Sequence, residues 1–183
     1  MTISADWPMT VEGQRASIVR FRGEVIEADW LDEAAQAIAG RAAPCALQAR
    51  LDDGDLGWWI LGDGAIVGAL CGKVVRLPDS VASSALIWTW LAIDAKWRAY
   101  GFGGASVPLL EGAARQAGAT IALTPLPPDN GVALYFWLRL GYTPVRSVDV
   151  APDDIPTGVA ADALWMQRPL SGTIPLHTQH SEE

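Results

Sequence analysis

The sequence predicts one α/β domain built on a central β-sheet. Three observations predict it: an apolar run at 85–93 that is typical of a strand buried on both faces, a glycine-rich segment that leads from this run into a helical pattern, and an alternation of strand and helix patterns along the chain. With 183 residues, 50% of them hydrophobic, the chain is long enough for one domain with a full core and too short for two.

The first half of the chain alternates strand and helix patterns. Apolar residues recur at helical spacing from Leu31 to Ile38, after an N-cap at Asp29 and before Gly40, which ends the pattern. Gly62-Asp63-Gly64 is a strong hairpin signal between two strands. We therefore expect, in order, a strand at 17–22, a helix between Asp29 and Gly40, a short helix at 44–51, and strands at 58–61 and 65–75.

The second half continues in the same way. Because side chains alternate along a strand, Trp88 and Trp90 are expected on one face of the strand at 85–93. We place the domain at 16–170, between an N-terminal tail at 1–15 and a C-terminal tail at 171–183. The remaining patterns predict a helix at 103–117, a strand at 120–124, a helix at 130–140, and strands at 142–150 and 161–169.

The segment from 91 to 105 carries most of the functional information. Gly101, Gly103 and Gly104 leave backbone N–H groups uncovered at the start of a helix, where the positive end of the helix dipole favours an anion. A Walker A loop is excluded because no lysine follows the last glycine. A dinucleotide-binding fingerprint is excluded because its first glycine follows the strand directly, whereas Gly101 lies well beyond Ile93. The segment therefore predicts a different kind of pyrophosphate site.

Two motifs in this region are similar to those of one known family. Residues 98–105, Arg-x-x-Gly-x-Gly-Gly-Ala, resemble the acetyl-CoA loop of the GNAT acetyltransferase superfamily. Residues 130–142, Asn-x-x-Ala-x-x-Phe-Trp-x-x-x-Gly-Tyr, resemble a second pattern of that superfamily, with Trp137 where tyrosine is usual. The resemblance implies a GNAT-like acyl-CoA N-acyltransferase fold, an α/β (α+β) domain with a mixed central sheet of about six to seven strands and helices on both faces.

The resemblance implies acetyl-CoA as the cofactor. The strand before the glycine loop would splay from its neighbour, and the pantetheine arm would lie in the opening. Asn130 would reach this arm from the next helix, although an ordinary helix N-cap is an equal alternative. The implied cofactor-binding residues are Leu91, Ala92 and Ile93 on the strand, Arg98, Gly101, Phe102, Gly103, Gly104 and Ala105 around the pyrophosphate, and Asn130 and Trp137 on the later helix.

The implied reaction is direct transfer of the acetyl group from the thioester to an amine, and this chain lacks two side chains that often assist it. Thr89 is the only polar side chain in the strand at 85–93, where relatives often carry an acid. Trp137 replaces a proton-donating tyrosine, and an indole N–H is not a useful acid near neutral pH. No catalytic residue is assigned. We favour protonation of the departing thiolate by water. Two alternatives stay open: an unrecognised side chain that donates the proton, and a chain that binds the cofactor with weak catalysis. An acyl group longer than acetyl on the cofactor also stays open.

Acidic and aromatic residues predict where the acceptor amine binds. Carboxylates and aromatic rings attract an ammonium group by charge and by cation–π contact, so a small cationic molecule or a peptide amine is the expected acceptor. The alternative is that these aspartates are solvated turn residues and that the tryptophans belong to the core. The candidates are Asp52, Asp53, Asp55, Trp58, Trp59 and Asp153, together with Asp149 and Asp154.

Composition limits the other function classes. The net charge of −8 argues against nucleic acid as a partner, and the longest apolar run, 85–93, is too short to span a membrane. Two cysteines and the lack of a secretory signal predict a reduced, cytoplasmic protein. Both histidines lie in the C-terminal tail, so no metal site is expected.

The resemblance is compatible with a homodimer. The alternative function is an acyl-CoA-binding module with weak or no catalysis, acting as a sensor or interaction partner.

Overall fold

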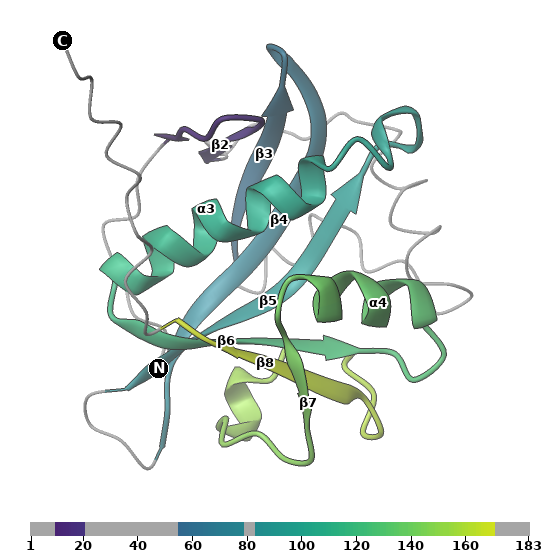
Figure 1. Cartoon of the computed structure of the whole chain (residues 1–183). Helices are drawn as coiled ribbons and strands as arrows, with labels where there is room; N and C mark the ends of the chain where they lie inside the picture. Colours follow the sequence, from purple (N-terminus) through teal and green to yellow (C-terminus); the bar gives the residue numbers. More distant parts are fainter. Residues whose placement is uncertain (1–9, 21–54, 79–82, 171–183) are drawn as a thin grey trace, which may run out of the picture.

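The computed structural model describes residues 10–20, 55–78 and 83–170. Strands in these ranges form one 8-stranded sheet in the order β1-β2-β3-β4-β5-β6-β8-β7, in which β5 and β6 are parallel and all other neighbours are antiparallel (Figure 1). The strands are β1 (Thr10–Val11), β2 (Ser17–Arg20), β3 (Leu56–Gly62), β4 (Ala65–Arg76), β5 (Ser84–Ile93), β6 (Ala119–Leu126), β7 (Thr143–Val145) and β8 (Leu164–Pro169). The helices are α3 (Phe102–Gln116) and α4 (Gly131–Arg139), with 3-10 helices η1 (Ala95–Trp97) and η2 (Pro152–Asp154).

The strands and helices expected between 55 and 170 are present, with shifted ends. The largest shift concerns the expected strand at 142–150, which is shortened to β7 and ends at Val145. β7 is the edge strand of the sheet and contains Pro144, which has no N–H to extend the pairing. The helices expected between Asp29 and Gly40 and at 44–51 lie outside the described residues.

β1 is an additional strand that the sequence patterns do not predict. Thr10 pairs with Val19 and Val11 pairs with Ile18, so residues 10–15 form a hairpin with β2 rather than part of an N-terminal tail. A strand of 2 residues is too short to show an alternating pattern, which explains why it is missed. The sheet is therefore mixed, as expected, but larger than the expected six to seven strands.

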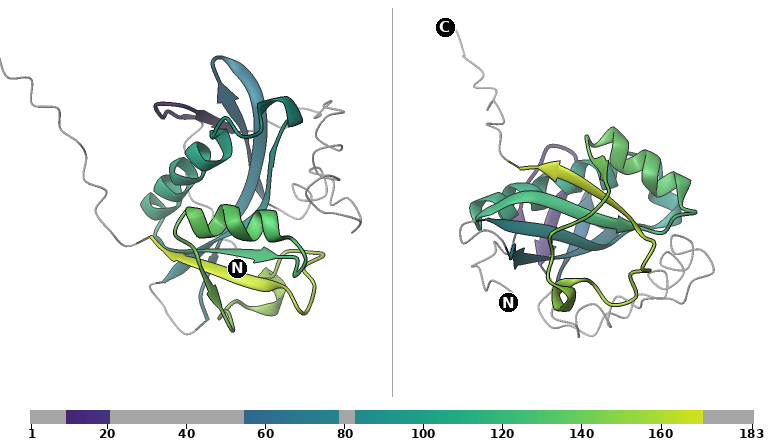
Figure 2. Two further views of the ribbon diagram at one scale, coloured as in Figure 1. Left: turned by 45° about the vertical axis from the view of Figure 1, so that its right-hand side comes forward. Right: turned by 90° about the horizontal axis from the view of Figure 1, so that it is seen from below.

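Both described helices lie over the same face of the sheet (Figures 1 and 2). The larger core cluster lies between this face and the helices, where Val107 and Leu110 of α3 are fully buried together with Ile60 and Leu86 of the sheet. A smaller cluster, which includes Ile87 of β5, lies on the opposite face. Within the described residues the α-helices cover only the first of these faces, whereas the resemblance implies helices on both faces.

A β-bulge in β5 changes the face to which its side chains point. Trp88 pairs with Gly72 and Trp90 pairs with the adjacent Cys71, so Thr89 is an extra residue without a partner on β4. Trp88 therefore belongs to the larger core cluster under the helices, whereas Trp90 points to the opposite face. The expectation that both tryptophans share one face is wrong, because a continuous apolar run does not reveal a one-residue insertion.

Candidate functional site

β5 and β6 diverge at their carboxyl ends. They pair over Ser84–Ile87 of β5 and Ala119–Leu123 of β6, although the strands continue to Ile93 and Leu126. Figure 1 shows the two strands pointing apart beyond the paired stretch. β6 remains paired with β8 as far as Leu126, while within the described residues no strand pairs with the β6-facing edge of residues 88–93. We call this the unpaired edge of β5.

The register between β4 and β5 decides which backbone groups face the unpaired edge. The Asp94 N–H donates to the Val67 carbonyl oxygen at 3.0 Å, and backbone hydrogen bonding alternates along an antiparallel pair. Ala92 therefore directs its N–H and C=O toward β4, while Leu91 and Ile93 direct theirs away from β4. The prediction for Ala92 is corrected accordingly, because its backbone groups belong to the β4–β5 pairing.

Arg98 covers part of the unpaired edge. Its Nε donates to the Ile93 carbonyl oxygen at 3.1 Å, so this carbonyl is already engaged by the protein. Asp94 stabilises the turn that precedes Arg98. Its Oδ1 accepts a hydrogen bond from the Lys96 N–H at 3.1 Å, and its Oδ2 lies 3.4 Å from the Lys96 ammonium. Leu91 is left as the residue that presents both its N–H and its C=O along this edge.

The glycine loop ends at an uncapped helix N-terminus. Gly101 is the N-cap of α3, adopts a left-handed conformation with φ 87°, and no side-chain hydrogen bond caps the helix. The Ala105 N–H donates to the Gly101 carbonyl oxygen at 2.9 Å, so the Ala105 amide is used by the helix itself. The N–H groups of Phe102, Gly103 and Gly104 precede that bond and have no acceptor within α3. These three amides are the groups that an anion at this end of α3 would meet.

Gly103 and Gly104 lie close to side chains from the end of β5 and from α4 and its C-terminus. A Cβ on Gly103 would lie 3.4 Å from Cγ1 of Ile93 and 3.5 Å from Cε2 of Phe136. A Cβ on Gly104 would lie 3.9 Å from Cδ2 of Leu140. The fold itself therefore tolerates a methyl group at both positions.

Arg15 belongs to this region and was missed by sequence reasoning. It lies in the turn between β1 and β2, yet its Nη1 donates to the Tyr100 carbonyl oxygen at 3.5 Å. The same nitrogen lies 2.8 Å from the position that a Cβ on Gly101 would take. No local pattern links Arg15 to a loop 85 residues later in the chain, so only the fold brings the two together.

Asn130 is the N-cap of α4. Its Oδ1 accepts a hydrogen bond from the Ala133 N–H at 3.0 Å, which is the usual N-cap geometry. The alternative of an ordinary N-cap is therefore confirmed. A contact between Asn130 and the cofactor arm stays a prediction.

Trp137 lies in a cluster of aromatic rings. It is 5% exposed, and its ring centroid lies 5.6 Å from that of Trp88, 5.2 Å from that of Phe136 and 4.7 Å from that of Tyr142. These contacts give Trp137 a packing role in the core under α4. Its predicted role toward the cofactor stays a prediction.

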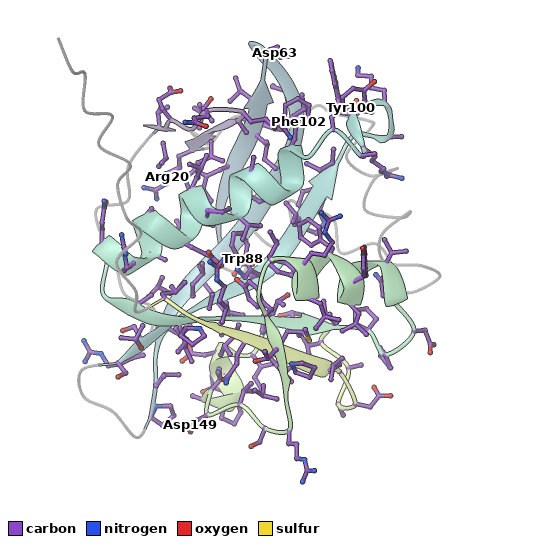
Figure 3. All side chains as sticks on the ribbon, viewed as in Figure 1. Arg20, Asp63, Trp88, Tyr100, Phe102 and Asp149 are labelled. Carbon is purple, nitrogen blue, oxygen red and sulfur yellow. The ribbon has the colours of Figure 1, made fainter. Side chains whose placement is uncertain are left out.

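A buried polar chain begins at Trp88, the first residue of the unpaired edge. Its Nε1 donates to the Tyr142 hydroxyl at 2.7 Å, and this hydroxyl donates to Oε1 of Glu111 at 2.6 Å. Nη1 of Arg168 donates to Oε2 of Glu111 at 2.9 Å. Figure 3 shows Trp88 between α3 and α4. These hydrogen bonds join β5, α3 and β8 at the point where β5 separates from β6. The sequence signal for them is one glutamate, Glu111, on an apolar face of the helix.

Burial raises the pKa values of two side chains in this hydrogen-bonded network, Glu111 and Tyr142. Burial raises the pKa of the Glu111 carboxyl above its ordinary value, although the hydrogen bond from Tyr142 and the charge of Arg168 oppose the shift. Burial also raises the pKa of the Tyr142 phenol, and the negative charge of Glu111 adds to this. Tyr142 therefore keeps its proton at neutral pH and serves as a fixed hydrogen-bond donor to Glu111 rather than as an acid for a departing thiolate.

The acceptor candidates around β3 do not lie on one face of the sheet. Trp58 is 1% exposed and belongs to the core cluster under α3, so its predicted contact with an acceptor is wrong and the core alternative holds. Trp59 is half-buried and points to the opposite face, where it pairs with Ala69. Trp90 points to that same face. Asp55, directly before β3, is buried.

The aspartates of the β7–β8 connection differ in exposure. Asp149 and Asp153 are exposed, whereas Asp154 is buried. The right-hand view of Figure 2 shows η2, which contains Asp153 and Asp154, on the side of the sheet opposite α4. Asp52 and Asp53 lie outside the described residues.

Residues 10–20, 55–78 and 83–170 contain neither a metal-binding cluster nor a helix suited to span a membrane. No group of three or more His, Cys, Asp or Glu side chains in these ranges is arranged to hold a metal ion. None of the helices in this part of the chain combines the length and the apolar character that a membrane span requires.

The fold is found in known acetyltransferases, although no protein-family model and no curated protein matches the sequence. The ribosomal-protein-S18-alanine N-acetyltransferase from Escherichia coli is 17% identical with a TM-score of 0.60, over 86% of this chain and 95% of that chain. A GNAT family acetyltransferase from Elizabethkingia anophelis with acetyl-CoA bound is 13% identical with a TM-score of 0.56, over 86% of this chain and 99% of that chain. An aminoglycoside 6′-N-acetyltransferase complexed with coenzyme A is 14% identical with a TM-score of 0.57, over 85% and 97%. The chain therefore has the fold of the GNAT acetyltransferase superfamily.

Proposed function

We propose that this protein is an acetyl-CoA-dependent N-acetyltransferase. One observation carries the proposal: the unpaired edge of β5 leads directly into the uncapped N-terminus of α3. A strand edge with free amide groups suits the amide-bearing pantetheine arm, and free amides at a helix N-terminus suit a pyrophosphate. The shared fold supports this assignment, since two structures with that fold hold coenzyme A or acetyl-CoA.

The residues present fit such a cofactor. Leu91 offers N–H and C=O groups to the arm, and Ile93 adds its N–H. Phe102, Gly103 and Gly104 offer their N–H groups to the pyrophosphate. The space that a Cβ on Gly103 would fill lies between the end of β5 and α4, beside those amides. Other predicted cofactor residues keep supporting roles in the proposal: Arg98 shapes the loop, Gly101 and Ala105 start the helix, and Asn130 and Trp137 hold α4 in place.

When bound, acetyl-CoA supplies an acetyl group as a thioester. The acceptor amine must lose its proton before it attacks, which costs a lysine-like amine with a pKa near 10.4 about 4–5 kcal/mol at pH 7. The departing thiol has an ordinary pKa of about 8.5 and leaves without an acid. The part of the chain that the structure describes offers no carboxylate on β5, so we assign its contribution to holding both reactants in line.

Thr89 is the polar side chain that we place at the point of transfer. It is the bulged residue of β5, immediately after Trp88. Its Oγ1 is buried and has no hydrogen-bond partner within the described residues. A buried hydroxyl without a partner costs about 1–3 kcal/mol, so this oxygen is suited to bind a water or an amine on the β5 strand.

We infer that the acceptor is a small cationic molecule or a peptide amine, bound on the face opposite α3 and α4. Trp59 and Trp90 point to this face and offer aromatic rings to a cation. The exposed carboxylate of Asp153 lies in η2 on the same side of the sheet. Roles for Asp52, Asp53 and Asp55 in acceptor binding, a cytoplasmic location and a homodimer stay predictions.

Release of thiol from acetyl-CoA in the presence of amines tests the proposal. We expect turnover with at least one member of a panel of polyamines, aminoglycosides, amino acids and peptide N-termini. Binding of acetyl-CoA is measured separately by calorimetry. Absence of binding would contradict the proposal outright. Tight binding without turnover on any amine would favour the second candidate, an acyl-CoA-binding module. Two features of the sequence support this candidate: the tryptophan at position 137 and the lack of an acid on β5.

A further inference from the structure

Lys73 is a buried cation near the middle of the sheet. It lies on β4 and is 8% exposed, and a lysine is seldom buried this deeply unless it is paired. The part of the chain that the structure describes offers its ammonium neither a hydrogen bond nor an ion pair. A positive charge that is largely withdrawn from water is costly without a counter-ion. The position therefore favours binding of an anionic group.

The Lys73 side chain lies on the face of the sheet opposite α3 and α4. Lys73 pairs with Ile87 of β5 and alternates with Val75 of β4, and both of these residues belong to the smaller core cluster on that face. β3, β4 and β5 run side by side at this point (Figure 1). The next pair along the same face is Cys71 with Trp90, whose ring we assign to the acceptor. Lys73 is therefore on the acceptor side of the sheet.

Lys73 also lies close to the proposed point of transfer. Its partner Ile87 is two residues before Thr89, which corresponds to about 7 Å along a strand. The ammonium of a lysine sits on a flexible four-carbon stem and reaches well beyond its own Cα. An acceptor whose amine lies at Thr89 can therefore place a carboxylate at Lys73 when the two groups are a few bonds apart.

Asp55 is the acidic residue that the register places beside Lys73. Leu56 pairs with Gly72, so Asp55, one residue earlier, lies across from Lys73. Both side chains are buried, but no ion pair joins them, and Asp55 has another interaction of its own. The positive charge of Lys73 is therefore left to a ligand.

We propose that Lys73 binds a carboxylate of the acceptor, so that the preferred acceptors are α-amino acids. The inference rests on the proposed function and narrows its acceptor class to amines that also carry an anionic group. A carboxylate accepts a charge-assisted hydrogen bond from the ammonium and supplies the counter-ion that it lacks. An amine without such a group leaves the buried charge of Lys73 unpaired in the complex and binds more weakly for that reason.

The test measures thiol release from saturating acetyl-CoA by the full chain with matched pairs of acceptors. Each pair joins an amino acid to the amine that lacks its carboxylate: leucine with isoamylamine, phenylalanine with phenethylamine, and ornithine with putrescine. We expect the amino acid to have the higher kcat/KM in each pair. Because the two amines also differ in basicity, the decisive quantity is the change of this preference in Lys73→Met. It should fall about ten- to hundredfold, the range for a charge-assisted hydrogen bond.

Two further variants serve as controls. Lys73→Arg keeps the charge and should keep most of the preference. Arg76→Met removes an exposed cation from the same strand and should leave the preference unchanged. A wild-type preference in Lys73→Met would overturn the inference while leaving the proposed function standing. Absence of turnover with every amine and amino acid would overturn the two together.

Stability gives a second readout that does not depend on turnover. Lys73→Met replaces an unpaired buried charge by an apolar side chain of similar length, so the midpoint of denaturant unfolding should stay equal or rise. A midpoint well below that of the wild type would show that Lys73 neutralises a partner within the protein, and this result would overturn the inference without touching the proposed function.

Discussion

The indole nitrogen of Trp88 donates a 2.7 Å hydrogen bond to the hydroxyl of Tyr142, 54 residues away in the sequence. This bond fixes β5 to the residue that precedes β7 at the point where β5 separates from β6. Because Trp88 and Tyr142 are both 1% exposed, water cannot replace either partner without a rearrangement of the core. The geometry of the proposed cofactor site therefore depends on a buried polar contact.

Removal of the Tyr142 hydroxyl is expected to destabilise the protein. Tyr142→Phe leaves the Trp88 N–H and Oε1 of Glu111 without their partner, which should lower the free energy of unfolding by about 1–3 kcal/mol. Denaturant unfolding measures this loss. Tyr135→Phe, on a side chain that is 64% exposed, should change the free energy by less than about 0.5 kcal/mol. Equal stabilities of the two variants would contradict the structural role of the hydroxyl.

Stability is expected to depend on pH through Glu111. Burial raises the pKa of this carboxyl in the folded protein above its ordinary value of 4.5, so the folded state holds the proton more tightly than the unfolded chain. The stabilising contribution of this group is therefore complete below pH 4.5 and is lost as pH rises through the folded-state pKa, with a limiting slope of about 1.4 kcal/mol per pH unit. Glu111→Gln should lack this component. A constant difference in unfolding free energy between variant and wild type across this window would show that Glu111 does not titrate as described.

A methyl group at Gly103 is expected to weaken cofactor binding while the protein stays folded. In Gly103→Ala the Cβ contacts Ile93 and Phe136 at 3.4 and 3.5 Å, so the fold is kept, and helix propensity favours alanine by up to about 1 kcal/mol. The same Cβ occupies the space assigned to the cofactor, so affinity for acetyl-CoA should fall at least about tenfold, by overpacking of roughly 1–3 kcal/mol. Gly112→Ala, with no atom within 4 Å, is the control. Unchanged affinity in Gly103→Ala would place the cofactor elsewhere.

Thr89 provides a test of catalysis without loss of stability. Thr89→Val replaces the hydroxyl by a methyl group of similar size. Because Oγ1 has no partner within the described residues, unfolding free energy should stay equal or rise by up to about 1 kcal/mol. Turnover should fall about tenfold at unchanged KM for acetyl-CoA, and Thr89→Ser should retain it. A Thr89→Val enzyme with wild-type turnover would remove Thr89 from the transfer step.

Trp137→Tyr tests whether a phenol at this position assists the departing thiolate. Trp137 is 5% exposed and enclosed by Trp88, Phe136 and Tyr142, so the smaller ring should leave a void that costs about 1–3 kcal/mol of stability. We expect no increase in turnover, and we expect Trp137→Phe to behave in the same way. A tyrosine variant far more active than the phenylalanine variant would instead identify the missing proton donor.

The sequence by itself determined the order of the strands and helices between 55 and 170, because their periodicity is written in residues at most a few positions apart. Glycine spacing likewise located the uncapped start of α3, since a left-handed Gly101 and side chains of minimal size are local requirements. The tertiary structure alone decided that Trp58 is core while Trp59 faces away, that the Thr89 bulge separates Trp88 from Trp90, and that Arg15 reaches the glycine loop. These are contacts between distant segments, and their energies depend on which strands pair and in which register, a property that no short window of residues contains.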